Sequence, residues 1–216
     1  MRYRCIMPAA DVAYDFTKER ILDGRFTGGE MISEGEIAAG VGLSRTPVRE
    51  AFLRLESEGL LRLYPKRGAL VVPVSAAEIE SVMETRLLVE RHAVEKVVRN
   101  GTDVTDELDA ELRTQEELVA AGDTAAFVDA DREFHRVLVA AGGNPILLQL
   151  HDSLRDRQSR MNLTALARDP RRMRQIVDEH RALVSALAEP SPAAAIRLIE
   201  RHLAGTVKLL LAEPTP

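Results

Sequence analysis

Residues 34–57 constrain the fold more than any other part of this 216-residue sequence, because their pattern is that of two short helices joined by a tight turn. Ile37 and the small Ala38 allow a close helix crossing, and Gly42 follows where a turn with positive φ is easiest for glycine. Apolar side chains then recur at helical spacing, namely Val48, Ala51, Phe52 and Leu55. The segment therefore predicts a helix-turn-helix.

The start of the second helix carries polar side chains away from its apolar face. Ser44 is placed to cap the helix through its hydroxyl, and Pro47 falls in the first turn, where a missing N–H costs little. Arg45, Thr46 and Arg49 lie where a recognition helix presents side chains to the major groove of DNA. The alternative interpretation is a structural helix pair with a solvated arginine face.

A predicted hairpin follows this motif. Residues 60–64 and 69–74 read as two short strands, joined by a turn at 65–68. A hairpin after a helix-turn-helix is a wing, and its tip residues Lys66 and Arg67 would reach phosphate or the minor groove. An ordinary solvated turn is the alternative.

The distribution of charge supports contact with DNA, although the whole chain has a net charge of −5. Residues 1–74 carry 11 Lys+Arg and 10 Asp+Glu, whereas residues 75–216 carry 18 and 24, so the excess acid lies in the second part. From Ser44 to Gly68, six basic residues face three acidic ones. A local basic surface is what phosphate contact requires.

The composition favours a helical, cytoplasmic protein. Hydrophobic residues make up 45% of the chain but aromatic residues only 4%, so leucine, valine, isoleucine and alanine must build the cores. The chain shows no apolar run of transmembrane length and no signal-peptide pattern. With Cys5 as the single cysteine, an intramolecular disulfide is impossible and a reducing cytosol fits.

A second domain begins after Pro73. We expect residues 1–74 to form the DNA-binding domain and residues 75–216 to form an all-helical, antiparallel bundle with short loops. Capping signals and apolar periodicity place its helices at about 76–99, 104–121, 124–140, 145–164, 169–188 and 191–211. The fold class is therefore mainly α.

Four polar residues of this bundle form a candidate metal site. Asp131 and His135 are four residues apart and share one helix face, next to apolar neighbours. His180 and His202 lie among apolar residues of the last two helices, so both can project inward. One carboxylate and three imidazoles suit one divalent ion per chain, zinc first, with nickel, manganese or iron as alternatives.

The alternative is that each histidine is a hydrogen-bonded core residue. His92 and His151 lack a partner at suitable spacing and are assigned structural roles. Glu133 and Glu179 neighbour the candidate ligands, but they lie about 100° away around their helices and are expected to face elsewhere. Without a placed general base, a metal-dependent enzyme is the weaker interpretation, and a metal sensor is a further one.

The sequence resembles a known family at both ends. Residues 44–51 read SRTPVREA and are followed by Arg54-Leu55 and Glu58-Gly59-Leu60, which resembles the signature of GntR-family transcription regulators. Residues 65–69 of the wing are similar to that family as well. The helical half, with Asp131, His135, His180 and His202, resembles the FCD domain of the FadR subfamily.

The resemblance implies a homodimer that binds a palindromic operator, most commonly as a repressor, and responds to a small organic acid. It implies DNA contacts at Arg45, Thr46, Arg49 and Arg54, and wing contacts around Arg67 and Gly68. With the capping residue and the wing tip, the candidate DNA-binding residues are Ser44, Arg45, Thr46, Arg49, Arg54, Lys66, Arg67 and Gly68.

The resemblance also suggests that Arg86 faces a cavity and pairs with an effector carboxylate. A surface salt bridge with Glu90, at i,i+4 spacing, is the alternative. Two departures from the family concern the DNA-binding half. Gly35 stands where charged or larger residues are common, and Gly28 stands where proline is frequent, which predicts a looser loop.

Overall fold

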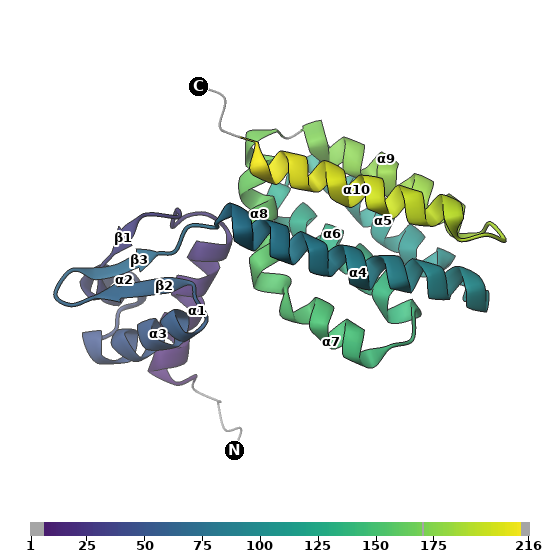
Figure 1. The fold of residues 1–216 in the computed structure, drawn as a ribbon. Coiled ribbons are helices and arrows are strands. Elements are labelled where there is room, and N and C mark those ends of the chain that lie inside the picture. The colour runs from purple at the N-terminus through teal and green to yellow at the C-terminus, as the bar shows by residue number, and fades with distance from the viewer. Residues whose placement is uncertain (1–6, 170, 213–216) are drawn as a thin grey trace, which may run out of the picture. The chain divides into compact units, whose positions relative to one another are not determined.

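The computed structural model describes residues 7–169 and 171–212, and these divide into two compact units on either side of the Val74–Ser75 bond (Figure 1). Cys5, Pro170, Pro214 and Pro216 lie outside the described residues. Each unit has its own core and is described by itself. Among the described helices, none is both long and apolar enough to cross a membrane.

The first unit is a winged helix-turn-helix, as predicted. Its described elements are α1 (Ala9–Leu22), β1 (Met31–Ile32), α2 (Glu34–Val41), α3 (Arg45–Ser57), β2 (Leu61–Tyr64) and β3 (Gly68–Val71). Ser33 caps α2 by accepting a hydrogen bond from the N–H of Glu36 at 3.1 Å. Gly42 ends α2 with φ 68°, which confirms the predicted turn. The apolar side chains of α3 are buried against α1 and the sheet.

Ser44 occupies the N-cap position of α3, but its side chain makes no capping hydrogen bond, so that detail of the prediction is wrong. A capping hydroxyl accepts from the second or third N–H of its helix. The third helical residue here is Pro47, which has no N–H to donate. The Ser44 side chain is exposed, and its hydroxyl does not accept a hydrogen bond from the first turn of α3.

The predicted hairpin is present as the antiparallel pair β2–β3, and β1 adds a third strand that was not predicted, in the order β1-β3-β2. Strand β1 has only two residues, which is too short for a periodic signal. Gly68 has φ 102°, and a Cβ there would lie 2.3 Å from the carbonyl oxygen of Ile32. Glycine at this position therefore permits β1 to pair with β3.

Gly28, the residue for which a looser loop was predicted, lies close to Pro73. A Cβ at this residue would lie 2.9 Å from the Cα of Pro73, so the two segments approach each other more closely than a larger residue allows. The absence of a side chain tightens this contact.

The second unit is a helical bundle. Its described helices are α4 (Ala76–Asn100), α5 (Thr105–Ala121), α6 (Thr124–Ala141), α7 (Pro145–Ser153), α8 (Arg155–Arg168), α9 (Arg171–Leu187) and α10 (Ala193–Leu211). Side chains of Ser75, Asp123 and Asn144 cap α4, α6 and α7 as expected. Helix α4 packs against α6 and α10, while α5 packs against α6 and α9 (Figure 1).

The single helix predicted for residues 145–164 is divided in the structure. Leu154 ends α7 and begins α8, with φ −86° and ψ −5°. No glycine or proline marks this break, so local sequence signals do not reveal it. The break leaves both His151 and Leu154 buried.

Candidate metal centre and nucleic-acid interface

The exposed face of α3 carries the side chains predicted to contact DNA. Arg45, Thr46 and Arg49 are exposed at its N-terminal end. Arg49 forms a bidentate contact with Glu34, at 2.8 Å from Nε and 3.1 Å from Nη2. The Arg45 side chain lies over Gly35, because a Cβ added at Gly35 would be 3.3 Å from Nη2 of Arg45. The missing side chain at Gly35 therefore leaves room for the Arg45 guanidinium.

Arg54 lies farther along α3 and has two partners that the sequence did not reveal. Its Nη1 is 2.5 Å from Oδ1 of Asp11, and its guanidinium lies 4.0 Å from the centre of the Tyr14 ring. Both partners come from α1, so packing of α1 on α3 sets the orientation of this arginine.

The wing tip presents two further cations. Lys66 and Arg67 are exposed, and Lys66 adopts φ 62° at the turn. Across residues 7–169 and 171–212, no carboxylate lies within ion-pair distance of Arg45, Lys66 or Arg67. These three charges are available to a polyanion without displacing an internal partner.

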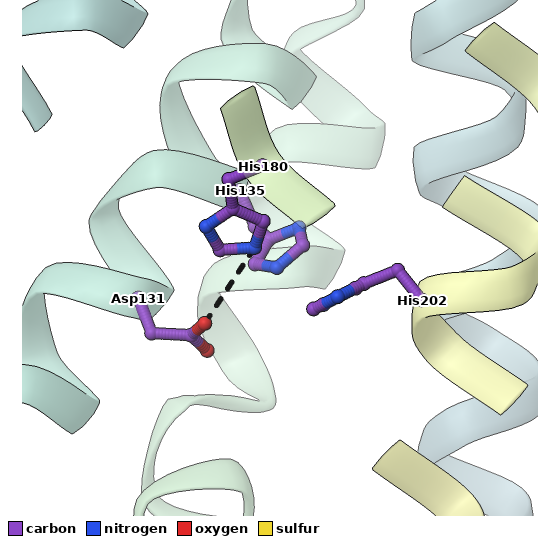
Figure 2. Close-up of side chains that lie close together, drawn as sticks. All are labelled: Asp131, His135, His180 and His202. Atoms are coloured by element: carbon purple, nitrogen blue, oxygen red, sulfur yellow. Dashed lines mark ion pairs between the residues drawn. The ribbon is translucent and has the colours of Figure 1, made fainter. Parts of the chain in front are cut away.

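The four candidate metal ligands converge in the core of the helical unit. Asp131 and His135 come from α6, His180 from α9 and His202 from α10 (Figure 2). One ligand atom from each residue lies within 4.8 Å of the others. All four residues are buried, with exposed fractions of 5% or less. Residues from three helices thus surround a small volume with one oxygen and three nitrogens.

Each histidine of this cluster has a polar partner at its other ring nitrogen. Nδ1 of His180 is 2.9 Å from Oε1 of Gln115, and Nδ1 of His202 is 2.7 Å from Oε2 of Glu179. Outer partners of this kind fix the tautomer, so that a proton on Nδ1 leaves the Nε2 lone pair for a metal.

The third outer contact has different geometry. Nδ1 of His135 lies 2.8 Å from Oε2 of Glu90, although the angle between the groups is not that of a regular hydrogen bond. Glu90 is on α4 and is fully buried. Burial by itself would raise the pKa of Glu90, but Arg86 and His135 hold it well below its usual value.

The prediction that Glu179 faces away from the site is wrong. Its carboxylate receives Nδ1 of His202 at 2.7 Å and both terminal nitrogens of Arg172, at 2.6 and 2.8 Å. Burial raises its pKa, yet these hydrogen bonds lower it to about 2. The position of Glu179 along α9 gives the direction of its side chain, but it does not show that His202 of α10 lies in that direction.

The inward-facing atoms of the cluster fit a metal ion. Nε2 of His135, Nε2 of His180 and Oδ1 of Asp131 are buried and have no hydrogen-bond partner among the described residues. Burial lowers the pKa of both His135 and His180. These rings are therefore neutral at pH 7, which is the form that binds a metal.

The structure bears on one of the two sequence-based alternatives for Arg86, the salt bridge with Glu90. Its Nε contacts Oε1 of Glu90 at 2.8 Å, so the i,i+4 ion pair exists, but it is buried rather than on the surface. Arg86 is 1% exposed, and its Nη2 has no hydrogen-bond partner within the described part of the chain. One end of this guanidinium is thus fixed and the other is unpaired.

His151, for which a structural role was predicted, lies outside the group of four candidate ligands. It is buried, and its Nε2 lies 3.6 Å from Oε1 of Glu90. His92, in contrast, is exposed on α4.

The fold and these two clusters define a class of protein: a winged helix-turn-helix joined to a helical domain with a buried Asp/His3 cluster. Residues 9–71 match the family described as bacterial regulatory proteins, gntR family, and residues 81–205 match the FCD domain. The chain belongs to the GntR family and carries an FCD domain, as the sequence resemblance indicated.

Individual relatives agree with this assignment. The chain is 36% identical over 132 residues to an uncharacterised HTH-type transcriptional regulator of Agrobacterium vitis, covering 59% of this chain and 77% of that protein. It is 30% identical over 190 residues to the "Probable D-xylose utilization operon transcriptional repressor" of Paenarthrobacter nicotinovorans, covering 88% and 83%.

A solved structure extends the agreement to nearly the whole chain. A GntR transcriptional regulator from Rhodococcus sp. RHA1 is 25% identical with a TM-score of 0.75, over 94% of this chain and 97% of that one. The family and these relatives are transcription regulators rather than enzymes, so this protein is a DNA-binding transcription regulator.

Proposed function

We propose that this protein represses transcription from an operator that it releases, or grips differently, when a small carboxylate binds beside a divalent metal ion in the helical domain. The observation that carries this proposal is the buried convergence of Asp131, His135, His180 and His202, with ligand atoms within 4.8 Å of one another. Buried groups with free lone pairs are costly unless a ligand uses them.

The donor set favours zinc, with nickel, manganese or iron as the alternatives. Three neutral imidazoles and one carboxylate are ligands for such ions, and Gln115 and Glu179 orient two of the rings. When bound, the ion would supply positive charge, and a coordination number above four would leave a position for an oxygen of a carboxylate.

Arg86 is the residue that we propose for the other end of the effector carboxylate. Its unpaired Nη2 lies in the core, and a guanidinium recognises a carboxylate by charge-assisted hydrogen bonds. Arg86 also stands among the charges that lower the pKa of His135 and His180. This coupling supports the proposal that Arg86 and the metal bind the same small anion.

On the DNA-binding side, we propose contacts from the N-terminal end of α3 and from the wing. These residues are Ser44, Arg45, Thr46, Arg49, Arg54, Lys66, Arg67 and Gly68. We further propose a homodimer of the FadR subfamily, acting in the cytoplasm on a palindromic operator, because a two-fold dimer reads two half-sites. Light scattering of the full chain tests the dimer, and a monomer at micromolar concentration would contradict it.

Operator binding by metal-free and metal-loaded protein, with and without small carboxylates, tests the proposed control. A thermal-shift screen identifies which carboxylates to use, because a ligand that binds the folded state raises the stability of the protein. The proposal predicts that the carboxylate changes operator affinity only when metal is present, with a coupling of about 1–3 kcal/mol. A response to metal alone would instead identify a metal sensor.

A further inference from the structure

Glu90 is a fully buried carboxylate on α4 that touches one candidate metal ligand, His135, and the candidate effector residue, Arg86. Its Oε1 accepts a hydrogen bond from Nε of Arg86 at 2.8 Å. Its Oε2 lies 2.8 Å from Nδ1 of His135, and His151 lies 3.6 Å from Oε1. A carboxylate is costly to bury unless it is paired, so these neighbours determine its position and charge.

The two oxygens of Glu90 have separate consequences. A proton on Nδ1 of His135, facing Oε2, leaves the Nε2 lone pair toward Asp131, His180 and His202. The bond from Oε1 to Nε of Arg86 fixes one edge of the guanidinium and leaves Nη2 without a partner. One side chain therefore orients a ligand of the metal and a ligand of the anion.

We propose that Glu90 is a positioning residue that links metal binding to carboxylate binding, by holding His135 in its metal-binding tautomer and Arg86 in its anion-binding orientation at the same time. This inference rests on the function proposed above. Part of the cooperativity between metal and carboxylate binding would then pass through Glu90, in addition to any direct contact between the metal and the carboxylate.

An amide at this position serves only one of the two purposes. Both His135 Nδ1–H and Arg86 Nε–H need an acceptor, and an amide has a single acceptor oxygen and an NH2 donor. When metal occupies Nε2 of His135, the proton must be on Nδ1, and the amide oxygen has to turn toward it. The NH2 group then faces Nε–H of Arg86, donor against donor, so anion binding suffers even when metal is saturating.

Glu179 provides a matched comparison. It also receives Nδ1 of a candidate metal ligand, His202, but its other partner is Arg172, which is already bound at both terminal nitrogens. Replacing Glu179 by Gln is the same chemical change and affects an outer contact of the same kind. Among its described contacts, none reaches Arg86.

The experiment compares wild type, Glu90→Gln and Glu179→Gln with zinc and with acetate, the simplest planar carboxylate. Zinc affinity is measured by competition with a chelator, and acetate binding by thermal shift at saturating zinc. Loss of an outer partner should weaken zinc binding by about 10–100-fold in both variants. At saturating zinc, we expect the thermal shift of Glu179→Gln to depend on acetate concentration as it does in wild type. Glu90→Gln should need at least about tenfold more acetate for the same thermal shift.

Equal acetate binding by the two variants at saturating zinc would overturn the link through Glu90. Wild type that binds neither zinc nor acetate would overturn the proposed function itself, and this inference with it. If circular dichroism shows Glu90→Gln unfolded, nitrogen NMR of metal-free wild type decides. A proton on Nδ1 of His135 supports the inference, and a proton on Nε2 contradicts it.

Discussion

The two units place their functional side chains in opposite environments. In the first unit the candidate DNA contacts are exposed, apart from the half-buried Gly68, and two of them, Arg49 and Arg54, pair with carboxylates of the same unit. In the second unit the candidate ligands are buried, with exposed fractions of 5% or less. An exposed ion pair contributes little net stability and can be exchanged for a phosphate contact. A buried polar cluster cannot change partners without a large desolvation cost, so it suits one small, specific ligand.

The largest effect of a single substitution is expected at the buried cluster. Replacing His180 by Ala removes one of four converging ligands and should lower metal affinity by on the order of 100-fold or more, since loss of an outer partner alone costs 10–100-fold. Operator binding without effector should stay within about twofold of wild type, because α3 belongs to the other unit. Chelator competition and gel shift measure the two quantities.

His92→Ala is the matched control for that variant, because His92 is an exposed histidine of the same unit. It should leave both metal affinity and effector response unchanged. If His180→Ala retains full metal affinity, His180 is a hydrogen-bonded core residue and no ligand.

At the exposed surface, Arg49→Ala should weaken operator binding by on the order of tenfold or more, because the residue is expected at the groove and not in a core. The helical circular dichroism spectrum should be unchanged. Arg25→Ala, which removes an exposed arginine paired with Asp23 outside α3, is the control. Operator affinity that survives Arg49→Ala would remove this residue from the recognition surface.

The buried histidines and carboxylates predict that metal-free protein loses stability in two stages as the pH falls. Burial lowers the pKa of His135 and His180, so below about pH 6.5 the unfolded chain binds protons that the folded chain does not. Glu179, with a pKa of about 2, adds a second loss below about pH 4.5. Urea unfolding of chelator-treated protein measures both stages, and constant stability from pH 7.5 to 5.5 would contradict the first.

The smallest effect is expected at the wing tip. Arg67→Ala should weaken operator binding for all DNA sequences alike and reduce the slope of log affinity against log salt by about one, if Arg67 contacts phosphate. Operator titrations at several salt concentrations give this slope. A slope equal to that of wild type would assign Arg67 to an ordinary solvated turn.

The sequence predicted most of the fold because its signals are local and periodic. The spacing of Val48, Ala51, Phe52 and Leu55 identified α3, and serine, aspartate and asparagine caps identified helix starts. The third strand of the sheet was missed because β1 has two residues. The break at Leu154 was missed because no glycine or proline marks it.

The candidate metal cluster could be predicted in part for the same reason. Asp131 and His135 are neighbours on one helix, and His180 and His202 lie on strongly apolar helix faces. All four side chains could therefore be expected to face a common core. Their outer partners could not be found in this way. Glu90, Gln115 and Glu179 reach the histidines across helix–helix contacts, and a single sequence does not give the rotation of one helix against another.

The central claim is that the buried cluster holds a metal ion that the effector response requires. Elemental analysis and zinc uptake of untagged, chelator-stripped protein, followed by operator binding with and without the active carboxylate, test it most directly. The account predicts one divalent ion per chain and an effector response that disappears on stripping and returns with metal. Protein that carries no metal, takes none up and still responds fully to its carboxylate would contradict it.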